Sequence, residues 1–160
     1  MPARLLPIYL DDHLAGATFG VELAQRASRN NAGNELGTFL ADGLLPEIVE
    51  DRRTLRELMD RLGLRPSRVK LAAGWLAEKA GRLKLNGELT RYSPLSRLLE
   101  LEGLASGVEA KQALWLSLNE VRGRDRRLAE VDFQQLAERA RSQRARLEPF
   151  RLAAAADALR

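Results

Sequence analysis

The sequence predicts an all-α protein built as a bundle of long helices. Apolar residues recur at helical spacing through most of the 160 residues, β-branched residues are scarce, and turn-forming residues gather at only a few places. With 45% hydrophobic and 30% charged residues and no apolar run of membrane-spanning length, the chain is predicted to fold away from any membrane. We expect a single domain over residues 1–160.

Two long helices are predicted in the first part of the chain. The first spans residues 6–28 and ends in a stretch rich in turn formers at residues 29–34. The second spans residues 35–62 with Gly63 as its C-terminal cap, and Pro46 inside it should bend the helix or start it afresh. Because the connection between them is short, the two helices should be antiparallel neighbours.

The next segment departs from this pattern. Pro66 and Ser67 mark the start of a shorter helix over residues 67–81, and an Asn86-Gly87 pair between short alternating runs indicates a tight turn. The connection from residue 63 to residue 93 is long enough to travel the length of a bundle. It therefore reads as a crossover that carries a short extra helix and a turn.

Two further long helices complete the prediction. Ser93-Pro94 is an N-cap followed by a proline at the first helical position, and it opens a helix over residues 94–121. After a turn at residues 123–125, a last helix spans residues 128–159, with Pro149 as a point where it can bend. Two antiparallel helix pairs joined by a crossover form an up-down four-helix bundle whose connectivity resembles the ferritin-like fold.

Several classes of site are excluded by composition. The chain has no cysteine and one histidine, which excludes disulfides, thiolate chemistry and any two-histidine metal site within one chain. The histidine, His13, follows Asp11 and Asp12, which could orient its ring, but its place near a helix start favours a capping or surface role. The small residues at positions 15–17 and 20 are interpreted as allowing close helix packing rather than ligand contact.

Carboxylates at plausible depth allow one metal hypothesis. Ferritin-like di-metal proteins use Glu-x-x-His motifs, whereas here arginine follows Glu50 and Glu138 at the third position. We therefore expect no cofactor. The alternative is a carboxylate-only site for manganese or iron, in which oxygen ligands favour a hard ion such as manganese or magnesium over iron. Its candidate ligands are Glu22, Glu50, Glu102 and Glu109.

A buried ionic network is the favoured interpretation of the same charges. Its expected members are Asp51, Arg53, Gln143 and Arg144. Removing one partner from a buried ion pair costs about 3–5 kcal/mol, so such a network can fix the register of the helices without performing chemistry.

The positive charge concentrates in the crossover. The net charge is +4, and residues 61–91 carry eight basic against two acidic residues. The crossover is the best candidate surface for an anionic partner, and Trp75 and Tyr92 lie among its cations as groups on which a base could stack. The candidate residues are Arg65, Arg68, Lys70 and Lys84. The competing interpretation is that these charges lie on solvated helix faces.

Several runs resemble a family of uncharacterised bacterial proteins with a ferritin-like helical fold. They are YLDDHLAG at residues 9–16, RLKLNG at 82–87, YSPLSR at 92–97, ELE at 100–102 and GVEAK at 107–111. The resemblance covers nearly the whole chain. It implies the fold but no activity, and no catalytic residue follows from it.

The function expected from the sequence is that of a structural or protein-binding module, with another protein or a second copy of the chain as partner. The first alternative is a carboxylate-only metal protein with oxidoreductase-like chemistry, and the second is nucleic-acid binding through the crossover. Because residues 1–7 lack the apolar run of an export signal, a cytoplasmic location is expected.

Overall fold

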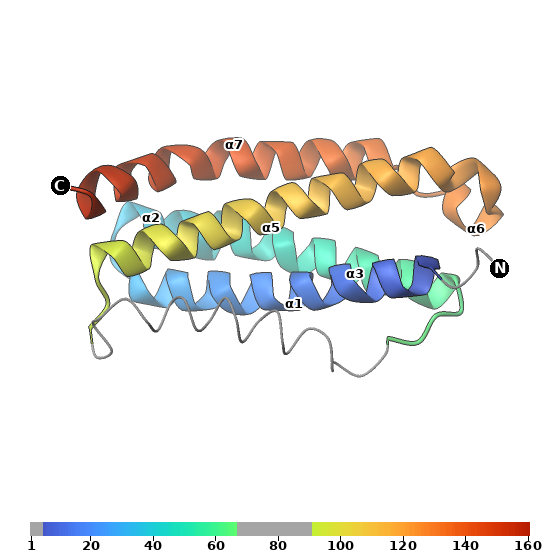
Figure 1. Ribbon diagram of the computed structural model, residues 1–160, viewed down its shortest axis with the longest axis horizontal. Helices are drawn as coiled ribbons and strands as arrows, with labels where there is room; N and C mark the ends of the chain where they lie inside the picture. The colour runs from blue at the N-terminus through green and yellow to red at the C-terminus, as the bar shows by residue number, and fades with distance from the viewer. Residues whose placement is uncertain (1–4, 67–90) are drawn as a thin grey trace.

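The computed structural model describes residues 5–66 and 91–160, and nearly all of them are helical (Figure 1). No strand occurs in these two ranges, which confirms the predicted all-α class. The predicted helix over residues 67–81 and the turn at Asn86-Gly87 lie outside them. The elements are α1 (Leu5–Asn30), α2 (Glu35–Thr38), the π-helical η2 (Phe39–Leu44), α3 (Leu45–Arg61), α5 (Pro94–Val121), the 3-10 turn η3 (Arg122–Arg124), α6 (Arg126–Ala129) and α7 (Phe133–Ala158).

The stop after α1 lies where the turn formers predict it. Gly33 has φ of +91°, a left-handed conformation that glycine adopts at little cost, and Asn34 then caps α2 by accepting the Gly37 N–H at 3.0 Å. Gly37 is also required for space, because a Cβ there would stand 2.0 Å from the backbone oxygen of Asn31. The junction between α1 and α2 is thus closed by direct backbone packing.

Pro46 restarts the second helix, as the sequence predicts, and the structure shows how. Proline cannot donate to the carbonyl four residues earlier, and its ring would clash with that carbonyl in a regular α-helix. The chain meets this constraint with the wider π-helical segment η2, after which Pro46 lies in the first turn of α3. The helix therefore continues in the same direction with its hydrogen-bond register changed.

The end of α3 is a Schellman motif around Gly63. The Leu64 N–H donates to the Met59 carbonyl at 2.9 Å, the Gly63 N–H donates to the Asp60 carbonyl at 2.9 Å, and Gly63 has φ of +71°. This geometry confirms the predicted C-terminal cap.

The second pair of helices matches the prediction at its start and departs from it at its turn. Helix α5 begins with the predicted cap, a capping box in which Ser93 accepts the Ser96 N–H at 3.1 Å. The predicted single helix over residues 128–159 is wrong, because the chain breaks after Ala129 and α7 begins only at Phe133. Asp132 caps α7 through the Gln135 N–H at 2.9 Å, and Asp125 caps α6 through the Arg127 N–H at 2.9 Å.

The long helices lie side by side along the length of the molecule (Figure 1). Helix α5 packs along α7, and α1 contacts both α3 and α5. In Figure 1, α5 diverges from α1 toward the end that carries α6. None of the helices in the described ranges is long and apolar enough to cross a membrane.

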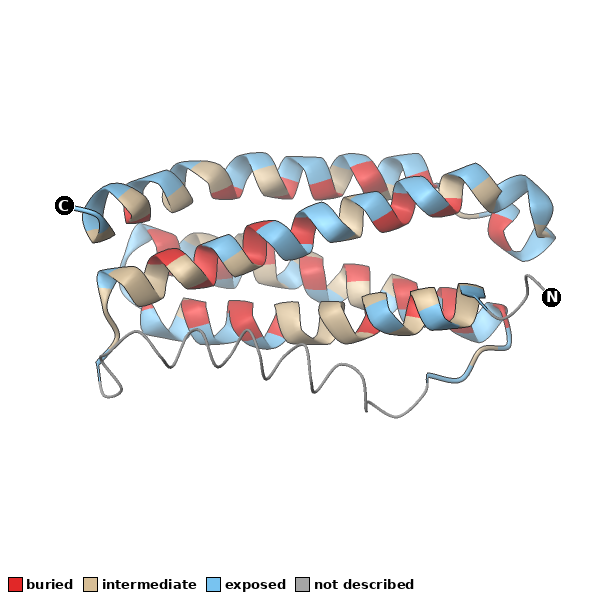
Figure 2. Ribbon diagram, viewed as in Figure 1, coloured by how far each residue is buried: buried red, intermediate tan, exposed pale blue. Residues whose placement is uncertain are grey.

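The buried residues face inward (Figure 2) and form two separate clusters, one toward each end of the helices. One cluster holds Leu23, Leu40 and Leu101, and the other holds Leu10, Leu55 and Trp115. Between them lie residues 15–20 of α1, 49–54 of α3, 106–113 of α5 and 138–146 of α7. The middle of the molecule is therefore the place where apolar packing is interrupted.

Candidate functional site

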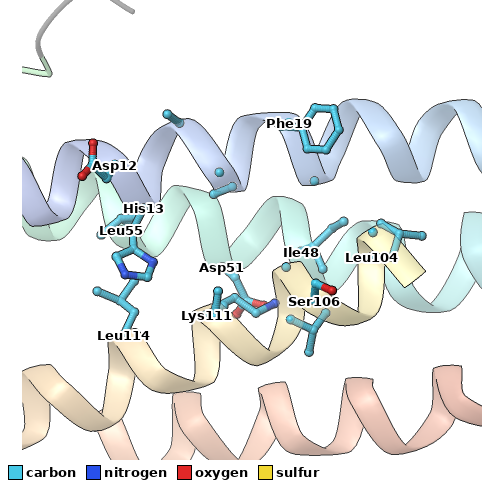
Figure 3. A pocket seen from close by; sticks show the side chains of 18 of the residues that line it. Asp12, His13, Phe19, Ile48, Asp51, Leu55, Leu104, Ser106, Lys111 and Leu114 are labelled. Carbon is cyan, nitrogen blue, oxygen red and sulfur yellow. The ribbon is translucent and has the colours of Figure 1, made fainter. Parts of the chain in front are cut away.

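A cavity of about 440 Å³ occupies this middle zone, between α1, η2, α3 and α5 (Figure 3). This volume lies within the range of about 300–1,000 Å³ that is usual for small-molecule sites. The described lining residues are mainly apolar, and they include Phe19, Leu44, Ile48, Leu55, Leu104, Val108, Leu114 and Trp115.

Small residues create the space on two sides. Helix α1 contributes Ala15, Gly16, Ala17 and Gly20, and α5 contributes Gly103, Gly107 and Ala110. A Cβ added at Gly16, Gly20 or Gly107 would meet no atom within 4 Å. The expectation that the small residues of α1 serve only close packing is therefore wrong, because they border open volume where larger side chains would fill it.

Asp51 of α3 supplies the buried charge at the wall of the cavity. Its side chain is 2% exposed, and its carboxylate accepts hydrogen bonds from Lys111 of α5, from Arg139 and, at 3.0 Å, from Gln143 Nε2 of α7. Lys111 also donates to Gln143 Oε1. We call Asp51, Lys111, Arg139 and Gln143 the cavity cluster. It ties three helices together at the level where the apolar core is interrupted.

The cavity cluster carries an excess positive charge. Two cations, Lys111 and Arg139, face the one carboxylate of Asp51, so the formal charge is +1. The nearest other acids have their own partners, since Glu47 pairs with Arg146 at 2.6 Å and Glu50 pairs with Arg53 at 2.7 Å. Burial lowers the pKa of Lys111, and Asp51 opposes this shift. The ammonium is therefore less well stabilised in the protein than in water.

Three buried donors in this region lack a partner within the described ranges, and one of them is Nε of Arg139. Lys111 has three N–H donors, and the described residues supply two acceptors. Trp115, which is fully buried and lines the cavity, has no acceptor for its indole N–H. Because unsatisfied buried donors are costly, the site is better suited to a ligand with an acceptor than to an empty state.

His13 and Asp12 of α1 lie at the other side of the cavity, and the His13 ring points toward α5 (Figure 3). Burial lowers the pKa of His13, with the charge of Asp12 acting in the opposite direction. The imidazole is therefore neutral at pH 7, and it packs edge-on against Tyr9 with the ring centroids 4.6 Å apart. This partly buried cavity position differs from the capping or surface role expected for His13.

The structure brings together two of the four residues expected in the ionic network. Asp51 and Gln143 meet in the cavity cluster, but Arg53 and Arg144 do not take part. The Arg53 side chain is 65% exposed and pairs with Glu50, and Arg144 pairs with Glu109 at 2.8 Å and with Glu148. Inclusion of Arg53 and Arg144 is therefore wrong, because both pair with carboxylates other than Asp51.

Lys111 and Arg139 take those two places, and the sequence contains a signal for the lysine. Lys111 lies three positions after Val108 and four before Trp115, on the apolar stripe of its helix. A lysine on such a stripe is a mark of a buried ion pair. Arg139 follows the same rule less clearly, since Leu136 and Gln143 flank it at the same spacings.

The carboxylates proposed as metal ligands do not converge. Glu22 is exposed, Glu50 pairs with Arg53, Glu102 lies 3.8 Å from Arg151, and Glu109 pairs with Arg144. In residues 5–66 and 91–160 no group of three or more histidine, cysteine or carboxylate side chains is placed to hold a metal ion. The carboxylate-only site is therefore contradicted by the positions of its candidate ligands.

A second buried carboxylate, Glu100, was not among the predicted site residues. It accepts hydrogen bonds from Arg26 at 2.9 Å, from Asn30 at 3.3 Å and from the Tyr92 hydroxyl at 2.9 Å. Asn31 donates to Tyr92 at 2.9 Å and accepts from Arg97 at 2.9 Å. We call these six residues the end cluster. They join the end of α1 to the start of α5, far along the helices from the cavity.

The anionic-partner candidates are placed only in part. Arg65 is exposed just after α3, whereas Arg68, Lys70, Lys84 and Trp75 lie outside the described ranges. Tyr92, proposed as a stacking group, is engaged in the end cluster instead, and Arg97 lies over its ring at 5.8 Å. The nucleic-acid hypothesis remains a prediction for the crossover.

Comparisons with known proteins give no relative for this chain: no family model matches it, and neither the curated proteins nor the solved structures contain a significant match.

Proposed function

We propose that this protein is a small-ligand-binding protein whose site is the cavity between α1, α3 and α5. The observation that carries the proposal is the cavity itself, about 440 Å³ in volume with a mainly apolar lining. The cavity opens to solvent, since Asp12, Ser106 and Gly107 in its lining are exposed, and an apolar space of this size forfeits packing contacts. Glycine and alanine along both walls keep this space open, because larger side chains there would fill it.

We also infer that the scaffold is a four-helix bundle of the ferritin-like kind. The short α1–α2 connection, the short α5–α7 connection and the long connection between residues 62 and 93 support this topology. A bundle of this kind commonly places its ligand site in the core, on facing helices near the middle. The cavity and the cavity cluster occupy that position here without a set of metal ligands.

This proposal replaces the partner expected from the sequence. A protein-binding module would use an exposed apolar face, and the large exposed apolar side chains of the described ranges belong to several elements: Leu5 and Ile8 on α1, Val49 on α3, Leu116 on α5, and Leu152 and the residue Leu159 at the end of α7. The apolar cavity favours a small molecule instead. Binding to a second copy or another protein remains a separate prediction.

Calorimetric titration with octanol tests the proposal, because this neutral probe reports the apolar cavity without any contribution from charge. We expect saturable binding to the parent protein with one site. Ala17→Leu places a larger side chain at the cavity wall and should abolish binding. Ala145→Leu makes the same change at an exposed position on α7 and should leave binding unchanged.

Binding that survives Ala17→Leu would place the probe elsewhere and overturn the proposal. Absence of octanol binding to the parent, with the protein shown to be folded by circular dichroism, would do the same. Cooperative unfolding of both variants confirms that the comparison concerns the cavity rather than the fold.

A further inference from the structure

The charge balance of the cavity cluster indicates what kind of ligand the cavity takes. Asp51 accepts hydrogen bonds from Lys111, Arg139 and Gln143, and the formal charge of the cluster is +1. The Arg139 side chain is 33% exposed, whereas the Lys111 side chain is 13% exposed and lies beside the apolar space. Buried cations are costly unless an anion compensates them. Glu47 raises the pKa of Lys111 by its charge, but it pairs directly with Arg146, and Glu50 pairs directly with Arg53, so no described acid other than Asp51 hydrogen-bonds to the cluster.

Lys111 is the cation that can reach a ligand. It lines the cavity, as does Asp51, whereas Arg139 lies behind them on α7. Figure 3 shows the Lys111 side chain extending from α5 to Asp51 at the cavity wall. With two of its donors directed to Asp51 and Gln143, the ammonium has one N–H left for an acceptor.

We propose that the ligand is an apolar monocarboxylate, such as a medium-chain carboxylic acid, whose carboxylate accepts a hydrogen bond from Lys111. The carboxylate neutralises the cavity cluster, and the hydrocarbon chain lies along the small residues of α1 and α5. The inference rests on the proposed function, since it specifies what the same cavity binds. It also explains why the site combines a mainly apolar lining with a single excess positive charge.

The remaining polar groups around the cavity are compatible with one anionic head group at Lys111. His13 is neutral at pH 7 and does not compete for the anion. Asp12 is exposed on α1, so solvent screens its charge, and a carboxylate at Lys111 is placed away from it on α5. A cationic head group would instead meet the excess positive charge of the cluster, which disfavours amines.

Comparison of octanoate with octanol separates the contribution of the carboxylate charge to affinity from that of the hydrocarbon chain. We expect the parent to bind octanoate at least about tenfold more tightly than octanol at pH 7, as one charge-assisted hydrogen bond predicts. Lys111→Met keeps the length of the side chain and removes its charge, leaving Asp51 balanced by Arg139 alone. The variant should bind octanoate about tenfold or more weakly than the parent does, while its affinity for octanol should change by less than about threefold.

Lys111→Arg is the conservative variant, and it should keep the preference for octanoate over octanol. The control is Arg56→Met, which removes a positive charge at an exposed position on α3. This control should bind both probes like the parent. Octylamine should bind more weakly than octanol to the parent.

The outcomes of the titrations distinguish failure of the carboxylate assignment from failure of the ligand-binding proposal. Equal affinity for octanoate and octanol, with both lost in Ala17→Leu, would overturn the carboxylate assignment and leave the ligand-binding proposal standing. No binding of either probe to the parent would overturn both. A preference for octanoate that persists in Lys111→Met would place the anion elsewhere and overturn the role of Lys111. If Lys111→Met does not fold, the parent's octanoate-to-octanol ratio and the Lys111→Arg variant still decide the question.

Discussion

The cavity cluster and the end cluster each bury one carboxylate, Asp51 and Glu100, and they differ in what surrounds it. Asp51 is held between two cations beside open volume. Glu100 pairs with Arg26, whose side chain is 46% exposed, while Arg97 lies 3.7 Å from Asp157. Each cluster therefore has a formal charge of +1, but the second cation of the end cluster, Arg97, has Asp157 beside it, whereas the cavity cluster borders open volume.

The difference separates a structural polar site from a binding site. In the end cluster the hydrogen bonds of Arg26 and Asn30 to Glu100, and those of Asn31 with Tyr92 and Arg97, join the end of α1 to the start of α5. In the cavity cluster Lys111 keeps one donor without a described acceptor, and it faces open volume. Substitutions should therefore affect stability at both places, but ligand binding only at the cavity.

Asp51→Ala is expected to have the largest effect on stability. It leaves Lys111 and Arg139 facing one another without a carboxylate, and loss of one member of a buried pair costs about 3–5 kcal/mol. Urea unfolding followed by circular dichroism measures the change. Asp42→Ala, at an exposed acid of η2, is the control and should change the free energy of unfolding by less than about 0.5 kcal/mol. Equal effects of the two variants would contradict the role of Asp51.

Glu100→Gln should destabilise the protein less than Asp51→Ala. It removes the charge that Arg26 and Tyr92 contact, but Arg26 can turn to solvent, so we expect a loss of about 1.5–3 kcal/mol. Octanol binding should stay at the parent level, because Glu100 does not line the cavity. Weaker octanol binding in this variant would show that the two clusters are coupled.

The two regions should respond to an added methyl group in opposite directions. Gly37→Ala brings a Cβ against the Asn31 backbone oxygen at the end cluster, and the required backbone shift costs about 1–3 kcal/mol. Gly20→Ala adds the same group in open space within α1 and should stabilise the protein by about 0.5–1 kcal/mol through helix propensity. Thermal unfolding of both variants tests this contrast, and a destabilising Gly20→Ala would argue against the cavity.

Tyr92→Phe has the smallest expected effect and a distinctive pH dependence. Burial and the neighbouring Glu100 carboxylate raise the pKa of Tyr92 to about 12, against 10.0 for the free side chain. The folded state therefore keeps its proton at a pH where the unfolded chain loses it. The stability contributed by the hydroxyl is complete below pH 10 and is lost as the pH rises toward about 12.

Tyr92→Phe should accordingly cost about 0.5–1.5 kcal/mol at neutral pH, where the hydrogen bonds to Asn31 and Glu100 are lost. The difference in the free energy of unfolding between the variant and the parent should narrow between pH 10 and pH 12. Urea unfolding of the two proteins at matched pH values measures it. A deficit independent of pH would show that Tyr92 titrates as in the unfolded chain.

The amino-acid sequence by itself determined the helices and most of their ends. The Asn34 and Ser93 caps, the glycines at 33 and 63 and the restart at Pro46 act through local backbone geometry, so they are readable without a structure. The break between α6 and α7 was missed because the helical pattern of apolar residues continues across it. The side chain of Asp132 caps the start of α7 there through one hydrogen bond.

Only the tertiary structure decided which charges are buried together and where the core is hollow. Asp51 was recognisable as a buried acid, but whether it meets Arg53 of its own helix or Lys111 and Arg139 depends on how three helices are rotated about their axes. The run of small residues on α1 has the same periodicity whether a neighbour packs against it or leaves open volume. Its role follows from the distance to α5, which no local pattern in the chain encodes.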